Sequence, residues 1–179
     1  MCFSAPASFI ASGVLATAGV ATLRETKTKK ELPFASIPIL FAIQQFIEGL
    51  VWISFGWVKL NTAFAYVYTL FSHVLWPIFV PLSILMLESD PLRRKFLQAF
   101  SVIGAGAGLY LLYCIGMEPI TAKVVGHSIL YDSPRTLSPW LYLAVTCGSC
   151  LISSFRTINV FGVALFISYG IVGIFYYEV

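Results

Sequence analysis

Two ionisable side chains interrupt long apolar runs of this sequence. Glu48 lies in the stretch QQFIEGLVW, and His73 lies in YTLFSHVLWPIFVPL. An ionisable group at the centre of a membrane costs about 2.5–3.5 kcal/mol even on insertion-based scales, so such groups face the interior of a helix bundle or a wet cavity. Glu48 and His73 are therefore the first candidates for a functional site.

The two residues should lie at similar depth on neighbouring antiparallel helices, because an α-helix rises about 1.5 Å per residue. A contact between them, as an ion pair or as a neutral acid hydrogen-bonded to imidazole, would offset both burial costs. Pro77 and Pro81 withhold backbone donors beside His73, which predicts a kink and a small polar cavity. The pair either holds the helices together or binds a ligand. The predicted lining of the site is Gln44, Gln45, Trp52, Tyr66, Thr69 and Trp76.

Further polar groups lie in the connection of residues 118–136. If this connection folds over the helices, its residues and their neighbours join His73 and Glu48 around an outward-facing cavity. These candidates are Cys2, Cys114, Glu118, His127, Tyr131 and Asp132. Histidine together with carboxylate suits zinc or another transition metal as a cofactor. The spacing matches no ligand motif, so the alternative is a set of separate polar groups in a solvated loop.

The cysteines are too few and too scattered for a disulfide scaffold. Cys2 and Cys114 should both lie near the outer membrane boundary, where an oxidising compartment permits a disulfide between them. Cys147 and Cys150 form the C-x-x-C of CGSC, a spacing that lowers a thiol pKa in redox proteins, but they fall within an apolar run. Small residues in such a run predict close helix packing instead.

The elements that must position these residues are transmembrane helices. Of the 179 residues, 59% are hydrophobic and 11% are charged, whereas about a quarter of a soluble domain is charged. A span needs about 20 mostly apolar residues. The predicted fold class is therefore all-α, a polytopic transmembrane helix bundle that forms a single domain with six spans. The predicted spans are residues 6–23, 34–57, 62–87, 96–117, 137–155 and 158–177.

The basic residues predict the orientation of this bundle. Eight of the 11 lysines and arginines lie in the first, third and fifth connections, which are therefore expected in the cytoplasm, with the N-terminus outside. The fourth connection, residues 118–136, is long and semi-apolar, which predicts an ordered outer lid. Small residues at four-residue spacing predict close contacts between helices: Ser8, Ser12 and Ala16 in the first span, and Gly104 and Gly108 in the fourth.

Missing motifs argue against several classes of function. The sequence contains no G-x-x-x-x-G-K-[ST], H-E-x-x-H or G-x-S-x-G motif, and no predicted span holds a lysine that could bind retinal. ATP-driven transport by this chain alone and rhodopsin-like photochemistry are therefore disfavoured. The basic residues form no continuous face that could follow a phosphate backbone, which argues against nucleic acid as a partner.

Four blocks of the sequence carry a family resemblance: MCFSAPASF, ELPFASIPILFAIQQFIEGLVW, SHVLWPIFVPL, and GLYLLY followed by ITAKVVGHSILYD. They resemble an uncharacterised family of bacterial integral membrane proteins that begin Met-Cys-Phe-Ser-Ala. The resemblance covers nearly the whole chain and places Cys2, Glu48, His73, His127 and Asp132 in matching blocks. It implies a further apolar segment after this sequence, hence a seventh span in the intact protein, and it implies no particular reaction.

These observations together predict a multi-pass protein of the bacterial inner membrane. We expect it to bind or pass a small solute, proton or metal ion through a polar cavity around Glu48 and His73. Glu48 would be the titrating carboxylate or cation ligand, and His73 its proton partner or a second ligand.

Two other classes of function remain open. The first is a membrane enzyme, either a metal-assisted hydrolase acting on a lipid or small amphiphile, or one in which Cys2 is an N-terminal nucleophile. The second is a structural accessory subunit of a membrane complex. The expected partners are membrane lipids, a small solute or ion, and further copies of the chain or a partner subunit.

Overall fold

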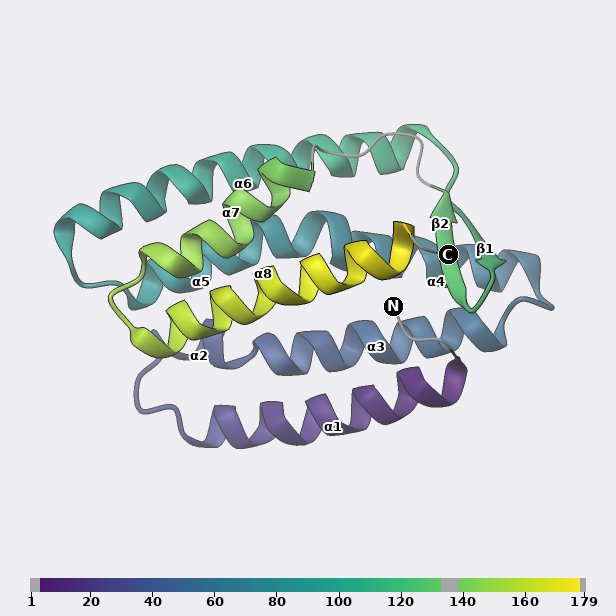
Figure 1. Cartoon of the computed structure of the whole chain (residues 1–179), viewed down its shortest axis with the longest axis horizontal. Coiled ribbons are helices and arrows are strands. Elements are labelled where there is room, and N and C mark those ends of the chain that lie inside the picture. The colour runs from purple at the N-terminus through teal and green to yellow at the C-terminus, as the bar shows by residue number, and fades with distance from the viewer. Residues whose placement is uncertain (1–3, 133–138, 178–179) are drawn as a thin grey trace. The chain divides into compact units, whose positions relative to one another are not determined.

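Helices account for most of the described chain (Figure 1). The computed structural model describes residues 4–132 and 139–177. The chain divides into two compact units, the first Met1–Val74 with Leu112–Arg135, and the second Leu75–Leu111 with Thr136–Val179.

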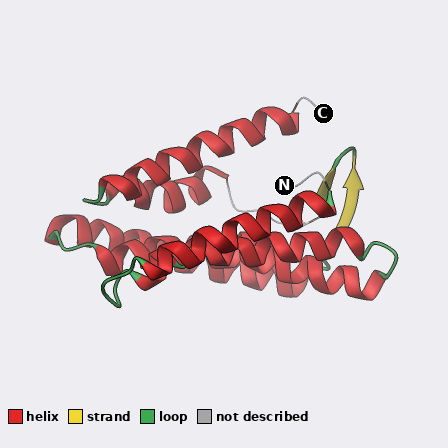
Figure 2. Ribbon diagram, turned by 90° about the horizontal axis from the view of Figure 1, so that it is seen from below, coloured by secondary structure: helices red, strands yellow, loops and turns green. Residues whose placement is uncertain are grey.

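The first unit combines the N-terminal helices with a β-hairpin, drawn in yellow in Figure 2. The first helix starts where the Ser4 hydroxyl accepts a hydrogen bond from the Ala7 amide, at 3.4 Å, and a proline stands in its first turn. The elements are α1 Ala5–Arg24, α2 Leu32–Ala35, α3 Ile37–Ile53, α4 Val58–Thr69, most of the π-helix η1 Leu70–Leu75, the end of α6 Pro91–Met117, β1 Thr121–Val125 and β2 Ser128–Asp132.

Helices α1 and α3 pack closely through small residues and hydroxyl donors. The Ser12 hydroxyl donates to the Ala42 carbonyl at 2.8 Å. A Cβ atom on Gly19 would lie 2.5 Å from Cγ1 of Ile39, so the two backbones approach too closely for any other residue there. Small residues and side-chain donors are the usual means of joining helices in lipid, where apolar burial offers little gain.

The fourth connection, which the sequence predicted to be an ordered lid, forms the hairpin. β1 and β2 pair antiparallel, from Thr121 opposite Asp132 to Val125 opposite Ser128. Gly126 adopts a positive φ of 58° in the two-residue turn, as such tight hairpins require. The segment is rich in β-branched residues and too short to span a membrane, which favours strands over another helix.

The second unit contains the remaining helices. Its elements are α5 Trp76–Leu87, the greater part of α6, α7 Pro139–Ile152 and α8 Arg156–Tyr177. A Cβ on Gly162 of α8 would lie 2.5 Å from Cβ of Cys150, and one on Gly148 would lie 3.3 Å from the ring of Phe100. Cys147 and Cys150 are buried free thiols. The prediction that CGSC is a packing element is therefore confirmed.

Four helical segments are long and apolar enough to cross a membrane. They are Ala5–Arg24, Leu32–Ile53, Val58–Leu87 and Pro91–Met117, while Trp140–Ile152 and Arg156–Ile171 are shorter apolar stretches. Helix α6 begins earlier than the predicted boundary of residue 96 because the Asp90 carboxylate accepts a hydrogen bond from the Arg93 amide at 2.8 Å and caps its first turn.

The third long helix is interrupted, as the prolines in it predict. The π-helix η1 directly precedes Trp76 and Pro77, and α5 then continues through Pro81. Because Pro81 has no amide hydrogen, the Pro77 carbonyl lacks its usual helical donor. Gly104 of α6 packs against this carbonyl so closely that a Cβ atom would overlap the oxygen. The predicted close contact at Gly104 is confirmed, with Pro77 as its partner.

A buried carboxylate joins the two connections of the second unit. Glu88 ends α5 with only 2% of its surface exposed. It accepts hydrogen bonds from the amides of Ser89 and Asp90, both at 3.0 Å, and from the Ser154 amide at 2.8 Å and hydroxyl. Burial alone would raise the pKa of Glu88, but these hydrogen bonds outweigh it and lower the pKa below the ordinary value of 4.5.

We predict that Gly104→Ala destabilises the protein by about 1–3 kcal/mol, the usual cost of overpacking, because the added methyl group meets the backbone of Pro77. Gly106→Ala on the same helix is the matched control, since a Cβ atom there meets nothing within 4 Å. Alanine is the better helix former, so the control should be neutral or slightly stabilised. Thermal unfolding of the purified protein in detergent measures both, and equal melting temperatures would contradict the close contact.

We also predict that stability depends on the ionisation of Glu88. A carboxyl group whose pKa is lowered by folding stabilises the protein above its unfolded pKa, and this contribution is lost as the pH falls through the folded value. Glu88→Gln should therefore cost about 1.5–3 kcal/mol at neutral pH, the worth of charge-assisted hydrogen bonds, and less below pH 4.5. Unfolding measured against pH gives both values. Glu25→Gln is the control, because Glu25 is exposed. The difference in unfolding free energy between this variant and the wild type should not change as the pH falls.

Candidate functional site

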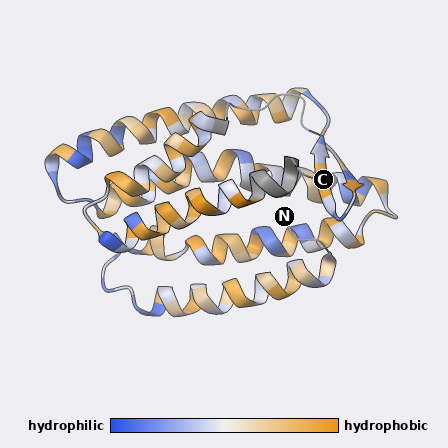
Figure 3. Cartoon of the chain, viewed as in Figure 1, coloured by the Kyte–Doolittle hydropathy of each residue, from blue (hydrophilic) through white to orange (hydrophobic). Residues whose placement is uncertain are grey.

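Glu48 is completely buried within the first unit, with 0% of its surface exposed. Figure 3 shows the hydrophilic residues around it as a blue interruption in an otherwise apolar helix α3. Gln44, one turn earlier, is 6% exposed, so it lies on the same buried face. Helix α1 covers this face, because a Cβ atom on the neighbouring Gly49 would lie 2.6 Å from the ring of Phe9.

The hairpin packs against helix α4 within the same unit. The Tyr66 hydroxyl accepts a hydrogen bond from the Ile120 amide at 3.3 Å and lies 3.4 Å from the Glu118 carbonyl, to which it donates. Ile120 is 1% exposed and packs in an apolar cluster with Ala65 and Ile115. Tyr66, which was predicted to line the site, therefore holds the start of the hairpin.

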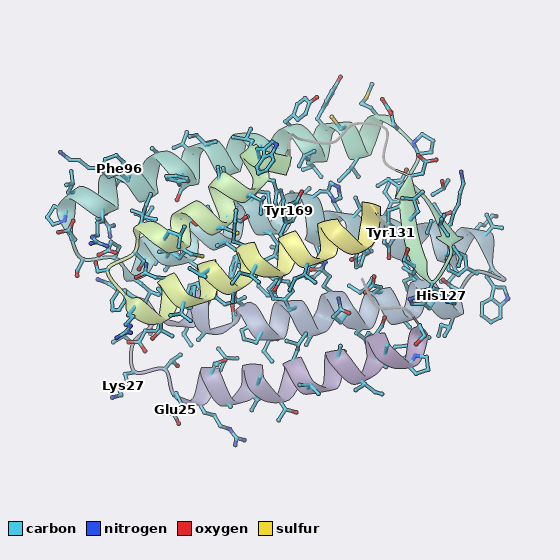
Figure 4. The ribbon with its side chains drawn as sticks, in the orientation of Figure 1. Glu25, Lys27, Phe96, His127, Tyr131 and Tyr169 are labelled. Atoms are coloured by element: carbon cyan, nitrogen blue, oxygen red, sulfur yellow. The ribbon has the colours of Figure 1, made fainter. Side chains whose placement is uncertain are left out.

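Tyr131 is the hairpin residue that packs against helix α4. Its ring stacks on Tyr68 of α4, with centroids 4.4 Å apart and planes 10° apart. Burial raises the pKa of Tyr131, and so do Tyr68 and the charge of Glu48, which places the hydroxyl and the carboxylate within electrostatic range. The buried Tyr131 hydroxyl has no hydrogen-bond partner among the described residues. Figure 4 shows Tyr131 on the strand, with His127 at the far end of the hairpin.

A second buried hydroxyl lies on the helix that covers Glu48. Ser8 of α1 is 0% exposed, and within residues 4–132 and 139–177 its hydroxyl has no hydrogen-bond partner. It directly precedes Phe9, whose ring packs against Phe46 and Gly49 on either side of Glu48 in the sequence. Ser8 and Tyr131 thus each place a buried hydroxyl in the unit that contains Glu48. Among the described residues, neither hydroxyl has a hydrogen-bond partner.

His73 does not contact Glu48 through any hydrogen bond or ion pair between described residues. Its Nδ1 atom lies 2.7 Å from the Ser72 hydroxyl, within the π-helix. The sequence argument assumed uninterrupted α-helix up to Pro77, and it did not consider the adjacent serine as a competing partner. The remaining predicted lining residues are placed separately: Gln45 and Trp52 are half-buried on α3, and Trp76 is buried in the second unit.

Two of the four residues predicted to bind a metal lie in the hairpin. His127 is exposed in the hairpin turn, and the Asp132 carboxylate, 60% exposed, pairs with Lys123 at 3.4 Å. In the part of the chain that the structure describes, no three histidine, cysteine, aspartate or glutamate residues lie together as a metal site requires. Cys114 is a buried free thiol, and Cys2 lies outside the described residues, so their disulfide stays a prediction.

Tyr131 was predicted only as one of several candidates in the outer connection, Ser8 was predicted only as a helix-packing residue, and Glu88 was not predicted at all. Alternation along the strand SILYD could have shown that Ile129 and Tyr131 share a face, once the strand itself was recognised. A serine in a small-residue helix and a glutamate at the end of an apolar run carry no comparable signal. The partner of Glu88, Ser154, is remote in sequence.

Comparison with known proteins identifies the family of the chain. A family model described as a family of unknown function, DUF6629, matches residues 1–176. No curated protein and no solved structure is similar to the chain. The match covers nearly all of the sequence, so the chain belongs to DUF6629, a family of unknown function.

Proposed function

We propose that this protein is a multi-pass inner-membrane protein that binds or passes a proton or a small cation at Glu48. The observation that carries the proposal is Tyr131, whose buried hydroxyl has no hydrogen-bond partner among the described residues and lies in the same unit as the fully buried Glu48. In this form of the site, Tyr131 and Ser8 act beside Glu48 in place of His127 and Asp132.

The energetics support a site over a purely structural cluster. Leaving a buried hydroxyl without a hydrogen bond costs about 1–3 kcal/mol, and native proteins keep few such groups. Here Ser8 and Tyr131 both pay this cost in one unit, beside Glu48. An occupant that interacts with their oxygens and with the carboxylate would recover it.

The chemistry of these groups favours a hard cation or a proton. Carboxylate, hydroxyl and amide oxygens are the ligands of alkali and alkaline-earth ions, whereas zinc and other transition metals take nitrogen and sulfur. Gln44, on the buried face of α3, supplies an amide oxygen one turn from Glu48. His73 stays a candidate proton partner, because it is an ionisable group of the same unit whose Nδ1 already interacts with the Ser72 hydroxyl.

The membrane arrangement belongs to the same proposal. We infer six spans, formed by the four long apolar segments and by α7 and α8, with the N-terminus outside the cell. The gathering of lysine and arginine in the first, third and fifth connections supports this orientation. On this topology the hairpin caps the outer side, and the Glu48 site opens outward.

The first test removes the two unpartnered hydroxyls. If the two hydroxyls only destabilise the fold, Ser8→Ala and Tyr131→Phe leave the melting temperature unchanged or raise it, and the effect of cations on the melting temperature stays the same. We predict that both variants are at least as stable as the wild type yet lose the stabilisation that a bound cation gives. Thermal unfolding in lithium, sodium, potassium, ammonium and choline chlorides at equal ionic strength measures it. Cation-dependent stabilisation that persists in both variants contradicts the site.

The second test removes the charge. Glu48→Gln should weaken cation-dependent stabilisation, and proton flux into proteoliposomes that hold a pH-sensitive dye, by about tenfold or more, since an interaction with a charged group is worth ~1.5–3 kcal/mol. Glu25→Gln is the control, because Glu25 is an exposed acid at the end of α1 (Figure 4). Normal folding with unchanged binding and flux in Glu48→Gln would refute the proposal. If the Glu48→Gln variant keeps binding and flux but no longer assembles with a subunit that co-purifies with the wild type, Glu48 has a structural role instead.

A further inference from the structure

Four basic side chains lie at one end of the second unit. Arg93, Arg94 and Lys95 occupy the first turns of α6, and Arg156 begins α8. All four are exposed. Positive charge at the start of a helix is unfavourable, because the helix dipole is itself positive there. The arrangement therefore needs a compensating interaction.

The two arginines of α6 reach other helix ends, where the dipole is negative. Nη1 of Arg93 donates to the carbonyls of Ile152 and Ser153, at 2.9 and 2.8 Å, at the end of α7. Nη1 of Arg94 donates to the carbonyls of Leu85 and Glu88, both at 3.2 Å, at the end of α5. These bonds fix the position of each guanidinium through one nitrogen and leave its other donors available.

The carbonyl partners hold the arginines in place without neutralising them. Within residues 4–132 and 139–177, none of the four basic side chains forms an ion pair. The nearby Glu88 carboxylate accepts its hydrogen bonds from the amides and the hydroxyl described above. The Asp90 carboxylate caps the first turn of α6. The result is a set of prepositioned positive charges beside two helix N-termini, an arrangement that favours a phosphate group.

Exposed apolar side chains stand among these charges. Leu92 is 64% exposed, Phe96 54% and Phe155 44%. Figure 4 shows Phe96 near the start of α6. A soluble phosphate compound has no apolar part that could contact these side chains. A phospholipid presents an anionic headgroup and acyl chains side by side.

From these observations we propose that the start of α6 and the start of α8 form a binding site for an anionic phospholipid. Arg93, Arg94 and Arg156 bind the headgroup phosphate, with Lys95 adding charge, and Leu92, Phe96 and Phe155 contact the acyl chains. The site is independent of Glu48, so either proposal can fail without the other.

The test measures stabilisation of the purified full chain by lipid. Melting temperatures are compared in detergent micelles that contain phosphatidylglycerol or phosphatidylcholine, and native mass spectrometry counts the bound lipids. The test variant is Lys95→Gln with Arg156→Gln. Both side chains are exposed and make no hydrogen bond in the described ranges, so we expect their loss to leave the fold intact. The matched control is the triple change Lys27→Gln, Lys29→Gln and Lys30→Gln, which removes exposed positive charges from the first connection.

We expect phosphatidylglycerol to raise the melting temperature of the wild type more than phosphatidylcholine does. The test variant should lose at least half of this shift, and the triple lysine control should keep it. A wild type that does not distinguish the two lipids, or a control that loses as much as the test variant, would overturn the proposal. A separate experiment adds inorganic phosphate without lipid. If phosphate raises the melting temperature of the wild type as much as phosphatidylglycerol does, and the test variant loses this rise, the ligand is a soluble phosphate. That result would overturn the lipid assignment.

Discussion

Backbone carbonyls at helix ends and helix interruptions determine how the helices of each unit meet. In a membrane such groups find no water, so the protein itself must supply donors or room for them. The Asn61 amide donates to the Val51 carbonyl at 3.0 Å and joins the end of α3 to α4. The Asn159 amide donates to the Cys150 carbonyl at 2.9 Å and joins α7 to α8. At Pro77, the carbonyl that Pro81 leaves without a donor is accommodated by Gly104.

The same requirement explains why Tyr131 stands out. Most hydroxyl groups in the described helices donate to a carbonyl of the preceding turn, as Thr69 does to Ala65 at 2.8 Å. Tyr131 is held by its ring, through stacking on Tyr68, and its hydroxyl takes part in no such bond among the residues described. A side chain fixed by its apolar part is free to use its polar part on something that is not backbone, which is what a ligand site needs.

Sequence reasoning succeeded where local chemistry decides the outcome. Apolar runs place the long helices, prolines announce the interruption before Trp76, and small residues mark the contacts at Gly104 and Cys150. It also identified Glu48 as a buried acid. These features depend on composition and spacing within about one or two helical turns, which the sequence displays directly.

The partners of the buried polar groups could not be predicted in this way. Depth matching paired Glu48 with His73, but depth leaves the rotation of each helix undetermined, and His73 bonds with Ser72 instead. The hairpin places Tyr131 against α4, whereas the sequence predicted only that this connection is an ordered lid. Glu88 has Ser154 as its partner across a long stretch of chain. Each of these outcomes is set by tertiary packing.

The Glu88 cluster also bears on how the second unit moves. Amide hydrogens in connections ordinarily exchange with solvent quickly, since loops open without disturbing the rest of a protein. The amides of Ser89, Asp90 and Ser154 all donate to one buried carboxylate, so opening either turn removes donors from the group that also holds the other turn. The turn between α5 and α6 and the turn between α7 and α8 should therefore behave as a single cooperative element, opening together and only when the helices themselves separate.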